Sequence, residues 1–254
     1  MLLLNRILTF LAPVLTFVSF EILFVKPTWI WFLFAAIQVI LFFIIWQITG
    51  RKFRSFQFWN FLITPHLFLA TACFFSISLE SRFFLHTVAV LSSVVLGIFL
   101  EEIFVYFNLP KKYYPYSLEN ISNYINLLTV FLLFSSLYSL IVFLNFSMWY
   151  LSLIVIAFIF LLAYQSTWVN KISFRKAWLF ILVITLILTE LFSVISFLPT
   201  SFYVNAIVLT VCYYIILGLS RFILLEELEK KPLRRYLIIG FIAIVIALLT
   251  AQWN

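Results

Sequence analysis

The sequence predicts an all-α protein, a polytopic transmembrane helical bundle of about nine spans. Apolar residues make up 66% of the 254 residues and charged residues only 10%. The apolar residues gather in successive runs of roughly twenty, the length that a helix needs to cross about 30 Å of hydrocarbon. These runs are apolar on every face, whereas a transmembrane barrel strand alternates apolar and polar residues. No stretch between runs is long enough to fold outside the membrane, so we expect one transmembrane domain over residues 1–254.

Each span is predicted from an apolar run and its flanks. We place the spans at residues 7–25, 28–49, 57–79, 83–107, 118–145, 147–168, 177–198, 206–225 and 236–253. The first lacks the small residues that signal peptidase requires, which indicates an uncleaved helix. The third and fourth are joined by residues 80–82 alone, which makes them antiparallel neighbours. The fifth begins after Ser117, a residue type favoured at helix starts.

The basic residues predict the orientation of the bundle. With the N-terminus inside and the C-terminus outside, all but two of the sixteen lysines and arginines lie on the cytoplasmic side, as the positive-inside rule requires. Only Lys26 and Arg82 fall outside. All eight tryptophans lie near predicted span ends, at headgroup level. This pattern favours a bacterial plasma (inner) membrane protein, and the net charge of +7 indicates contact with anionic lipids rather than nucleic acid.

The composition argues against several functions. There is no aspartate, so the Asp pairs that hold Mg²⁺ in many phosphate-handling membrane enzymes are missing. The four glycines lie far apart, which excludes a glycine-rich phosphate loop. Two histidines at opposite depths do not supply a zinc site. We therefore expect no metal, no cofactor and no catalytic set, and with 33 phenylalanines we expect the helices to pack through bulky side chains.

Polar residues inside the inner half of the membrane are the first candidate site, because ionisable groups are costly in lipid. The candidate inner polar cavity comprises His66, Glu101, Glu102, Glu119, Asn123, Asn126 and Arg221. His66 and the two glutamates of span four have similar depths on neighbouring helices, so we expect them to face each other beside Pro65, which frees a helix carbonyl. Two interpretations stay open. In the first, these residues line a water-filled pocket that opens to the cytoplasm. In the second, they form a structural cluster: Glu101 and Glu102 pair with Lys111, Lys112 or Arg221, and Glu119 marks a helix start.

A second candidate site lies in the outer half of the bundle. Glu190 matches Tyr213 and Tyr214 in depth, so a tyrosine hydroxyl is expected to hold its carboxyl group. Such a group is either a neutral structural acid or a site for a proton or cation. Glu21 and His86 lie closer to the outer surface, where they either pair with each other or reach water.

Two cytoplasmic segments, residues 108–117 and 226–235, are long enough to contact lipid headgroups or a partner protein. Three functions remain open. The first is a membrane component of a transport or export system for a lipid or other small substrate. The second is a non-catalytic scaffold or subunit that recruits a membrane or cytosolic partner. The third is a membrane-embedded lipid-modifying enzyme that uses His66 and Glu101.

Overall fold

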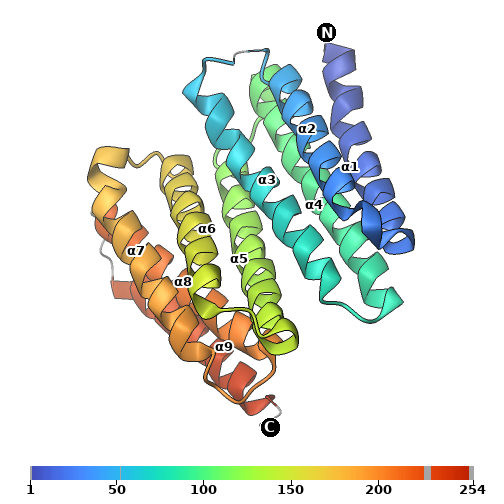
Figure 1. The fold of residues 1–254 in the computed structure, drawn as a ribbon. Coiled ribbons are helices and arrows are strands. Elements are labelled where there is room, and N and C mark those ends of the chain that lie inside the picture. Colours follow the sequence, from blue (N-terminus) through green and yellow to red (C-terminus); the bar gives the residue numbers. More distant parts are fainter. Residues whose placement is uncertain (1, 52, 226–229, 252–254) are drawn as a thin grey trace. The chain divides into compact units, whose positions relative to one another are not determined.

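The computed structural model describes residues 2–51, 53–225 and 230–251, and the side chains of these except at 230–233. Two compact units divide the chain after Ile125, within one long helix, and each is described by itself. The described residues form α-helices joined by short connections, which confirms the all-α helical bundle (Figure 1). The prediction of a single domain stays a prediction.

The first unit is built from four antiparallel helices and the start of a fifth. These elements are α1 (Leu2–Val25), the 3₁₀ turn η1 (Pro27–Trp29), α2 (Ile30–Ile48), α3 (Phe56–Ile77), α4 (Arg82–Asn108), the 3₁₀ turn η2 (Pro110–Lys112) and α5 (Ser117–Leu144). Helix α1 packs on α4 and α2, α2 packs on α3, and α3 packs on α4. The predicted antiparallel contact of the third and fourth spans is therefore confirmed.

The second unit takes the rest of α5 and four further helices. These are α6 (Met148–Val169), α7 (Phe174–Ile195), α8 (Phe202–Leu224) and α9 (Lys230–Leu249). Consecutive helices from α6 to α9 pack on each other. An aromatic cluster fills the unit: the Tyr138 ring lies 4.8 Å from that of Phe192, on which Phe134 also stacks.

Serine marks the start of most helices after α2. Helices α3, α4, α6, α7 and α8 begin directly after Ser55, Ser81, Ser147, Ser173 and Ser201, each in extended conformation. Serine favours this position because its hydroxyl is able to accept from the free N–H groups of the first turn, and Ser201 accepts from the Val204 N–H. Helix α5 ends at Leu144 and is followed by Asn145, whose φ of 48° is the left-handed conformation that Asn tolerates just after a helix C-terminus.

Among the described residues, eight helices, α1 to α8, are long and apolar enough to cross a membrane. Helix α9 carries basic residues in its first turns, and its apolar part, residues 236–249, is about 21 Å long at 1.5 Å per residue. Its predicted span ended at residue 253, and residues 252–254 lie outside the described residues. The ninth crossing therefore stays a prediction.

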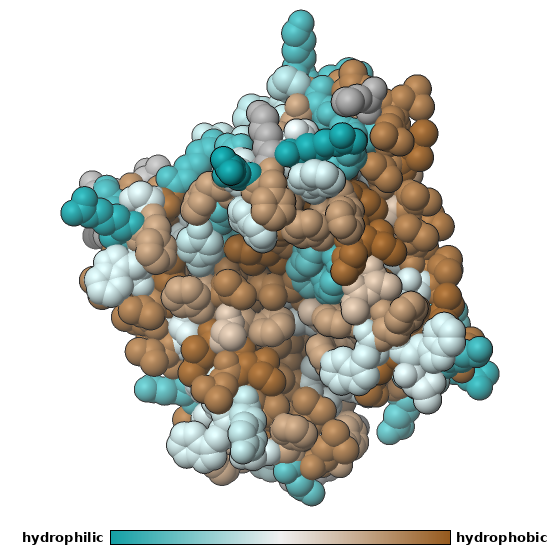
Figure 2. Space-filling view, turned by 45° about the horizontal axis from the view of Figure 1, so that its top comes forward, coloured by the Kyte–Doolittle hydropathy of each residue, from teal (hydrophilic) through white to brown (hydrophobic). Residues whose placement is uncertain are grey.

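Large apolar side chains face outward along the helices. On the side shown in Figure 2, hydrophobic residues cover much of the surface. On α4, for example, Leu91, Val94 and Ile98 are all exposed on one face. Aqueous surfaces rarely expose such continuous apolar faces, whereas hydrocarbon solvates them. The protein is therefore an integral membrane protein.

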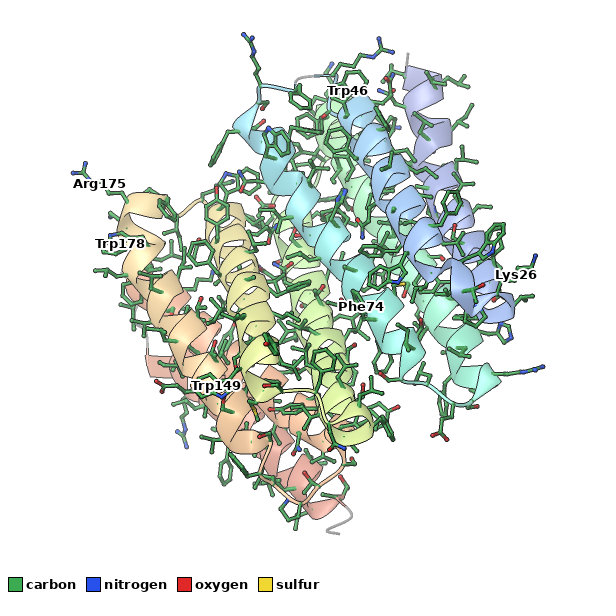
Figure 3. All side chains as sticks on the ribbon, in the orientation of Figure 1. Lys26, Trp46, Phe74, Trp149, Arg175 and Trp178 are labelled. Carbon is green, nitrogen blue, oxygen red and sulfur yellow. The ribbon has the colours of Figure 1, made fainter. Side chains whose placement is uncertain are left out.

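The ends of each unit carry the residues typical of a membrane boundary. In the first unit, Trp46 and Lys26 lie at opposite ends, and in the second unit Arg175 and Trp178 lie at the end opposite to Trp149 (Figure 3). Indole rings prefer the headgroup level, so these positions agree with helices that cross the membrane.

Helix contacts at glycine correct the expectation of packing through bulky side chains alone. A Cβ atom on Gly97 of α4 would lie 2.9 Å from Cγ of Pro13 on α1, and Cβ atoms on Gly218 and Gly240 would collide with side chains of the facing helix in the α8–α9 pair. These three of the four glycines in the chain thus permit close approach of two helices, as small residues commonly do in membranes.

Candidate functional site

His66 and Gln38 form a polar pair at mid-depth of the first unit. His66 Nδ1 lies 2.9 Å from the Leu62 carbonyl oxygen, and Nε2 lies 3.2 Å from the Gln38 carbonyl oxygen. In return, Gln38 Nε2 donates to the His66 carbonyl at 3.2 Å. Counted at 1.5 Å per residue, Gln38 lies about 12 Å from the start of α2 and His66 about 15 Å from the start of α3. The pair therefore joins α2 to α3 near the membrane centre.

A narrow hollow lies beside this pair. It is bounded by α1, α2 and α3, and its space of about 290 Å³ includes space that is open to the surroundings of the protein. Most of its lining is apolar, with Ser19, Gln38 and Cys73 as the polar members. Three lining residues lie near the predicted outer side: Phe20 near the end of α1, Leu33 near the start of α2 and Cys73 near the end of α3. The hollow therefore runs from Gln38 toward the predicted outer side.

Glu101 and Glu102 do not bond to His66 in the described part of the chain, contrary to our expectation of a facing pair. The Thr9 hydroxyl of α1 donates to Glu101 Oε2 at 3.3 Å. Glu102 is half-buried, and it continues the exposed face of Leu91, Val94 and Ile98 at helical spacing. The rotation of α4 about its axis directs Glu101 toward α1.

A network of amides joins the predicted inner ends of α1, α2 and α4. Asn5 Nδ2 donates to Asn108 Oδ1 at 3.1 Å, and Gln47 Nε2 donates to Asn5 Oδ1 at 3.3 Å. Asn108 Nδ2 donates to the Ile48 carbonyl, and Arg51 donates to Gln47. These contacts satisfy polar groups at helix ends and fix three helices to one another. These contacts were not predicted from the sequence, although amide side chains near span ends are a usable signal.

Three residues of the predicted inner cavity, Glu119, Asn123 and Asn126, lie on α5. Tyr113, in the connection before α5, donates to Glu119 Oε2 at 2.8 Å and accepts from the Leu118 N–H. Burial and the neighbouring Glu119 carboxylate both raise the pKa of the Tyr113 hydroxyl. In the second unit, Asn126 Nδ2 donates to Gln165 Oε1 on α6 at 2.5 Å. Asn123 is half-buried on the same helix.

Arg221 lies in the last turn of α8, where a basic side chain complements the helix dipole. Because the predicted inner cavity combines residues of both units, its existence as one cavity stays a prediction. Of the two predicted cytoplasmic segments, residues 226–229 lie outside the described residues. In the other segment, Lys111 and Lys112 are exposed.

The predicted bond between Glu190 and a tyrosine is wrong for Tyr213. Glu190 is exposed on α7, whereas Tyr213 is 1% exposed and its hydroxyl has no hydrogen-bond partner. The buried face of α7 passes through Leu188 and Phe192, which turns Glu190 outward. Tyr214 stacks on Tyr236 of α9, with ring centroids 4.8 Å apart.

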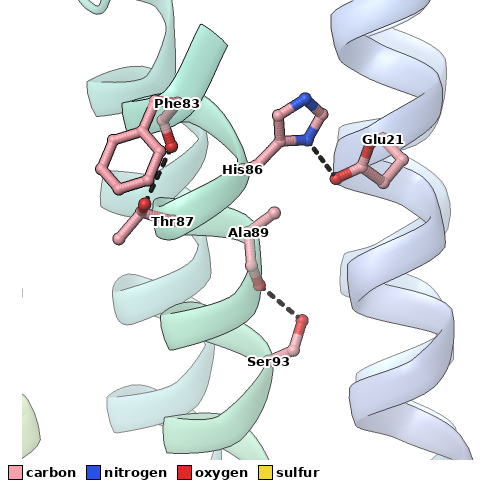
Figure 4. Close-up of polar contacts among 6 residues, drawn as sticks. All are labelled: Glu21, Phe83, His86, Thr87, Ala89 and Ser93. Carbon is pink, nitrogen blue, oxygen red and sulfur yellow. Dashed lines mark hydrogen bonds and ion pairs between the residues drawn. The ribbon is translucent and has the colours of Figure 1, made fainter.

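Glu21 and His86 pair with each other, which was one of the two alternatives predicted for them; the other was contact with water. Glu21 Oε1 of α1 lies 2.7 Å from His86 Nδ1 of α4 (Figure 4). Farther along α4, the Ser93 hydroxyl donates to the Ala89 carbonyl of the same helix. The pair is partly exposed near the predicted outer ends of both helices.

Taken together, these contacts define a class of protein: a multi-pass helical membrane protein whose polar groups join helices. Within the described residues, no group of three or more His, Cys, Asp or Glu side chains is placed to hold a metal ion. The chain belongs to the DUF5656 family, proteins of unknown function, whose profile matches residues 14–250. No curated protein and no solved structure matches the chain.

Proposed function

We propose that this protein is a membrane component of a transport or export system for a lipid or other small apolar substrate, and that the hollow beside Gln38 receives part of that substrate. The hollow is the observation that carries the proposal. Ligand sites are concave and mostly apolar, with a few polar groups that fix orientation. Here Phe20, Phe34 and Leu69 supply apolar wall, and Gln38 supplies an amide at the deep end.

The neighbourhood of the hollow supports a substrate with an apolar tail. A second narrow hollow, bounded by α1, α2 and α4, shares Ile37 with the first, and its space of about 220 Å³ likewise includes space that is open to the surroundings of the protein. The residues that line the second hollow are apolar except for Thr16, so an acyl chain that enters from the lipid would contact mainly apolar side chains.

The proposal includes a location and an orientation, namely the bacterial plasma membrane with the N-terminus in the cytoplasm. In the first unit, five of the seven described basic residues gather at the end that holds the start of α1, the α2–α3 turn and η2, and Lys26 and Arg82 lie at the other end. The five are Arg6, Arg51, Arg54, Lys111 and Lys112. Such a cluster suits anionic headgroups of the inner leaflet. Reporter fusions at residues 53, 114 and 173 should report cytoplasm, and fusions at 146 and 202 the outside. One reversed position would refute the orientation.

Photolabelling tests the binding step directly. The protein is reconstituted in nanodiscs with a fatty acid that carries a diazirine on its chain, irradiated, and mapped by peptide mass spectrometry. We expect label on residues of the hollow. Ser19→Phe places a ring in the hollow and should reduce this label several-fold, whereas Leu91→Phe adds the same ring on the exposed face of α4 and should leave it unchanged.

The thermal unfolding midpoint of each variant shows whether it folds. If Ser19→Phe folds and the label within the hollow persists, or if label appears only on exposed faces, the hollow does not hold the substrate. In that case the scaffold alternative gains support, because it requires no internal binding site.

A further inference from the structure

The His66 ring is held between two hydrogen-bond acceptors. Its Nδ1 faces the Leu62 carbonyl and its Nε2 faces the Gln38 carbonyl, at 2.9 and 3.2 Å. A neutral imidazole has one N–H and one lone pair, so it bonds only one of these oxygens and directs its lone pair at the other. An imidazolium ion has two N–H groups and satisfies both. The geometry therefore fits the protonated ring better than the neutral one.

Gln38 adds a second and independent observation. Its Nε2 donates to the His66 carbonyl, but its Oε1 is buried and has no hydrogen-bond partner. A buried amide oxygen without a donor costs free energy unless a water or ligand reaches it. Gln38 lines the hollow, whereas His66 does not. A proton carrier in the hollow would therefore have to reach His66 by way of the Gln38 side chain.

The helices around His66 bring no compensating charge to it. Helix α2 contains no acidic or basic residue between Ile30 and Ile48. On α4, Glu101 accepts from Thr9, Tyr106 packs on Phe61 and Tyr113, and His86 pairs with Glu21. Glu102 continues the exposed face of α4, and Arg82 is exposed at its start. On α3 itself, the titratable neighbour is Cys73, about 10 Å away along the helix. Carbonyl dipoles alone are thus available to stabilise a positive ring.

We propose that the Gln38–His66 pair is a reversible proton-binding site. A hydronium ion in the hollow transfers its proton to the ring nitrogen that carries the lone pair, and water remains. The imidazolium then donates to both the Leu62 and Gln38 carbonyls and holds α3 to α2. Loss of the proton leaves one donor, and when that donor stays on the Leu62 carbonyl of α3, the Gln38 carbonyl of α2 is released and the contact between the two helices loosens. This site goes beyond the proposed apolar substrate and is independent of it, since the proton needs no second ligand.

The chain offers a clean test because it contains only two histidines. In the His86→Gln variant, His66 is the sole histidine, and nitrogen NMR of histidine-labelled protein in nanodiscs reads its protonation state without any transport assay. We expect the doubly protonated signal at acidic pH and its conversion to a neutral tautomer as the pH rises. A single neutral tautomer throughout the pH range in which the protein stays folded would overturn the proposal.

A second measurement follows the helix contact. The Phe34 and Phe74 rings of α2 and α3 lie 6.0 Å apart, so cysteines at these positions, in a background without Cys73 and Cys212, report the separation of the two helices. The crosslinking reagent must react at a rate that does not depend on pH. With such a reagent, the crosslinking yield should decrease several-fold from acidic to alkaline pH. His66→Gln should remove this dependence, and His86→Gln should keep it. The same pH dependence in His66→Gln would refute the coupling, while photolabelling of the hollow would remain an unaffected test of the substrate.

Discussion

Enlarging Gly97 should force α1 away from α4. The Cβ atom of an added side chain would lie 2.9 Å from Pro13 Cγ, whereas carbon atoms pack best at about 3.5 to 4.0 Å. The proline ring has no rotamer with which to withdraw, so the helices have to separate by roughly 0.6 Å or more. Overpacking of this kind costs about 1 to 3 kcal/mol. Alanine regains about 1 kcal/mol of helix propensity, so Gly97→Ala should cost about 0 to 2 kcal/mol.

Gly97→Leu should cost more than Gly97→Ala, because it adds a branched side chain at the same contact while its gain in helix propensity is similar. The assay has two parts: the free energy of unfolding in detergent, and crosslinking of cysteines placed at positions 21 and 86, where side chains of α1 and α4 are in contact. Both stability and crosslinking yield should fall. Val94→Leu on the exposed face of α4 is the control and should change neither. If Gly97→Leu behaves like Val94→Leu, the close approach of α1 and α4 at Gly97 is not a feature of the folded protein.

Three further predictions concern single polar contacts. Glu21→Gln and His86→Gln should show a coupling energy below about 1 kcal/mol in a double-mutant cycle, because both side chains are partly exposed; a coupling of several kcal/mol would contradict this. Asn126→Leu should lower the free energy of unfolding by about 1 to 3 kcal/mol, because it leaves the side-chain oxygen of the fully buried Gln165 without its donor. The double variant Asn126→Leu with Gln165→Leu should recover part of this loss. If it recovers nothing, the hydrogen bond between the two residues is not the cause of the loss. Glu190→Gln should change stability by less than about 0.5 kcal/mol, since Glu190 is exposed; a larger loss would point to an unrecognised partner.

The helices themselves were predictable because each rests on a local physical requirement. A run of about twenty apolar residues satisfies its backbone hydrogen bonds in lipid only as a helix, and eight such helices are present. Their ends were also close to the predicted positions. Span 83–107, for example, is the helix Arg82–Asn108. Serine at five helix starts is a signal in the sequence that would have located those starts more closely.

Side-chain partners were harder to predict, because the sequence gives depth along a helix but not rotation about its axis. His66 and Glu101 have similar depths, yet their hydrogen bonds run to α2 and to α1. Glu190 and Tyr213 also match in depth, but one is exposed and the other buried. The glutamines were not predicted as contacts between helices. Gln38 and Gln165 carry no charge, so their cost in lipid is lower than that of an ionisable group and their sequence signal is weaker, although each bonds a neighbouring helix.

The contacts of the first unit hold the two ends of α2 in different ways. Helix α1 is bonded to α4 at both ends, through Thr9 to Glu101 and through Glu21 to His86. The inner end of α2 is bonded to the same two helices through Gln47 and the Ile48 carbonyl. Within the described residues, the side-chain hydrogen bonds of the outer half of α2 end at Gln38, which holds α3. The outer half of α2 is thus held to α3 through Gln38 and through the contacts of Trp31 and Phe34 with Phe74, whereas its inner end is fixed to α1 and α4 by amide hydrogen bonds.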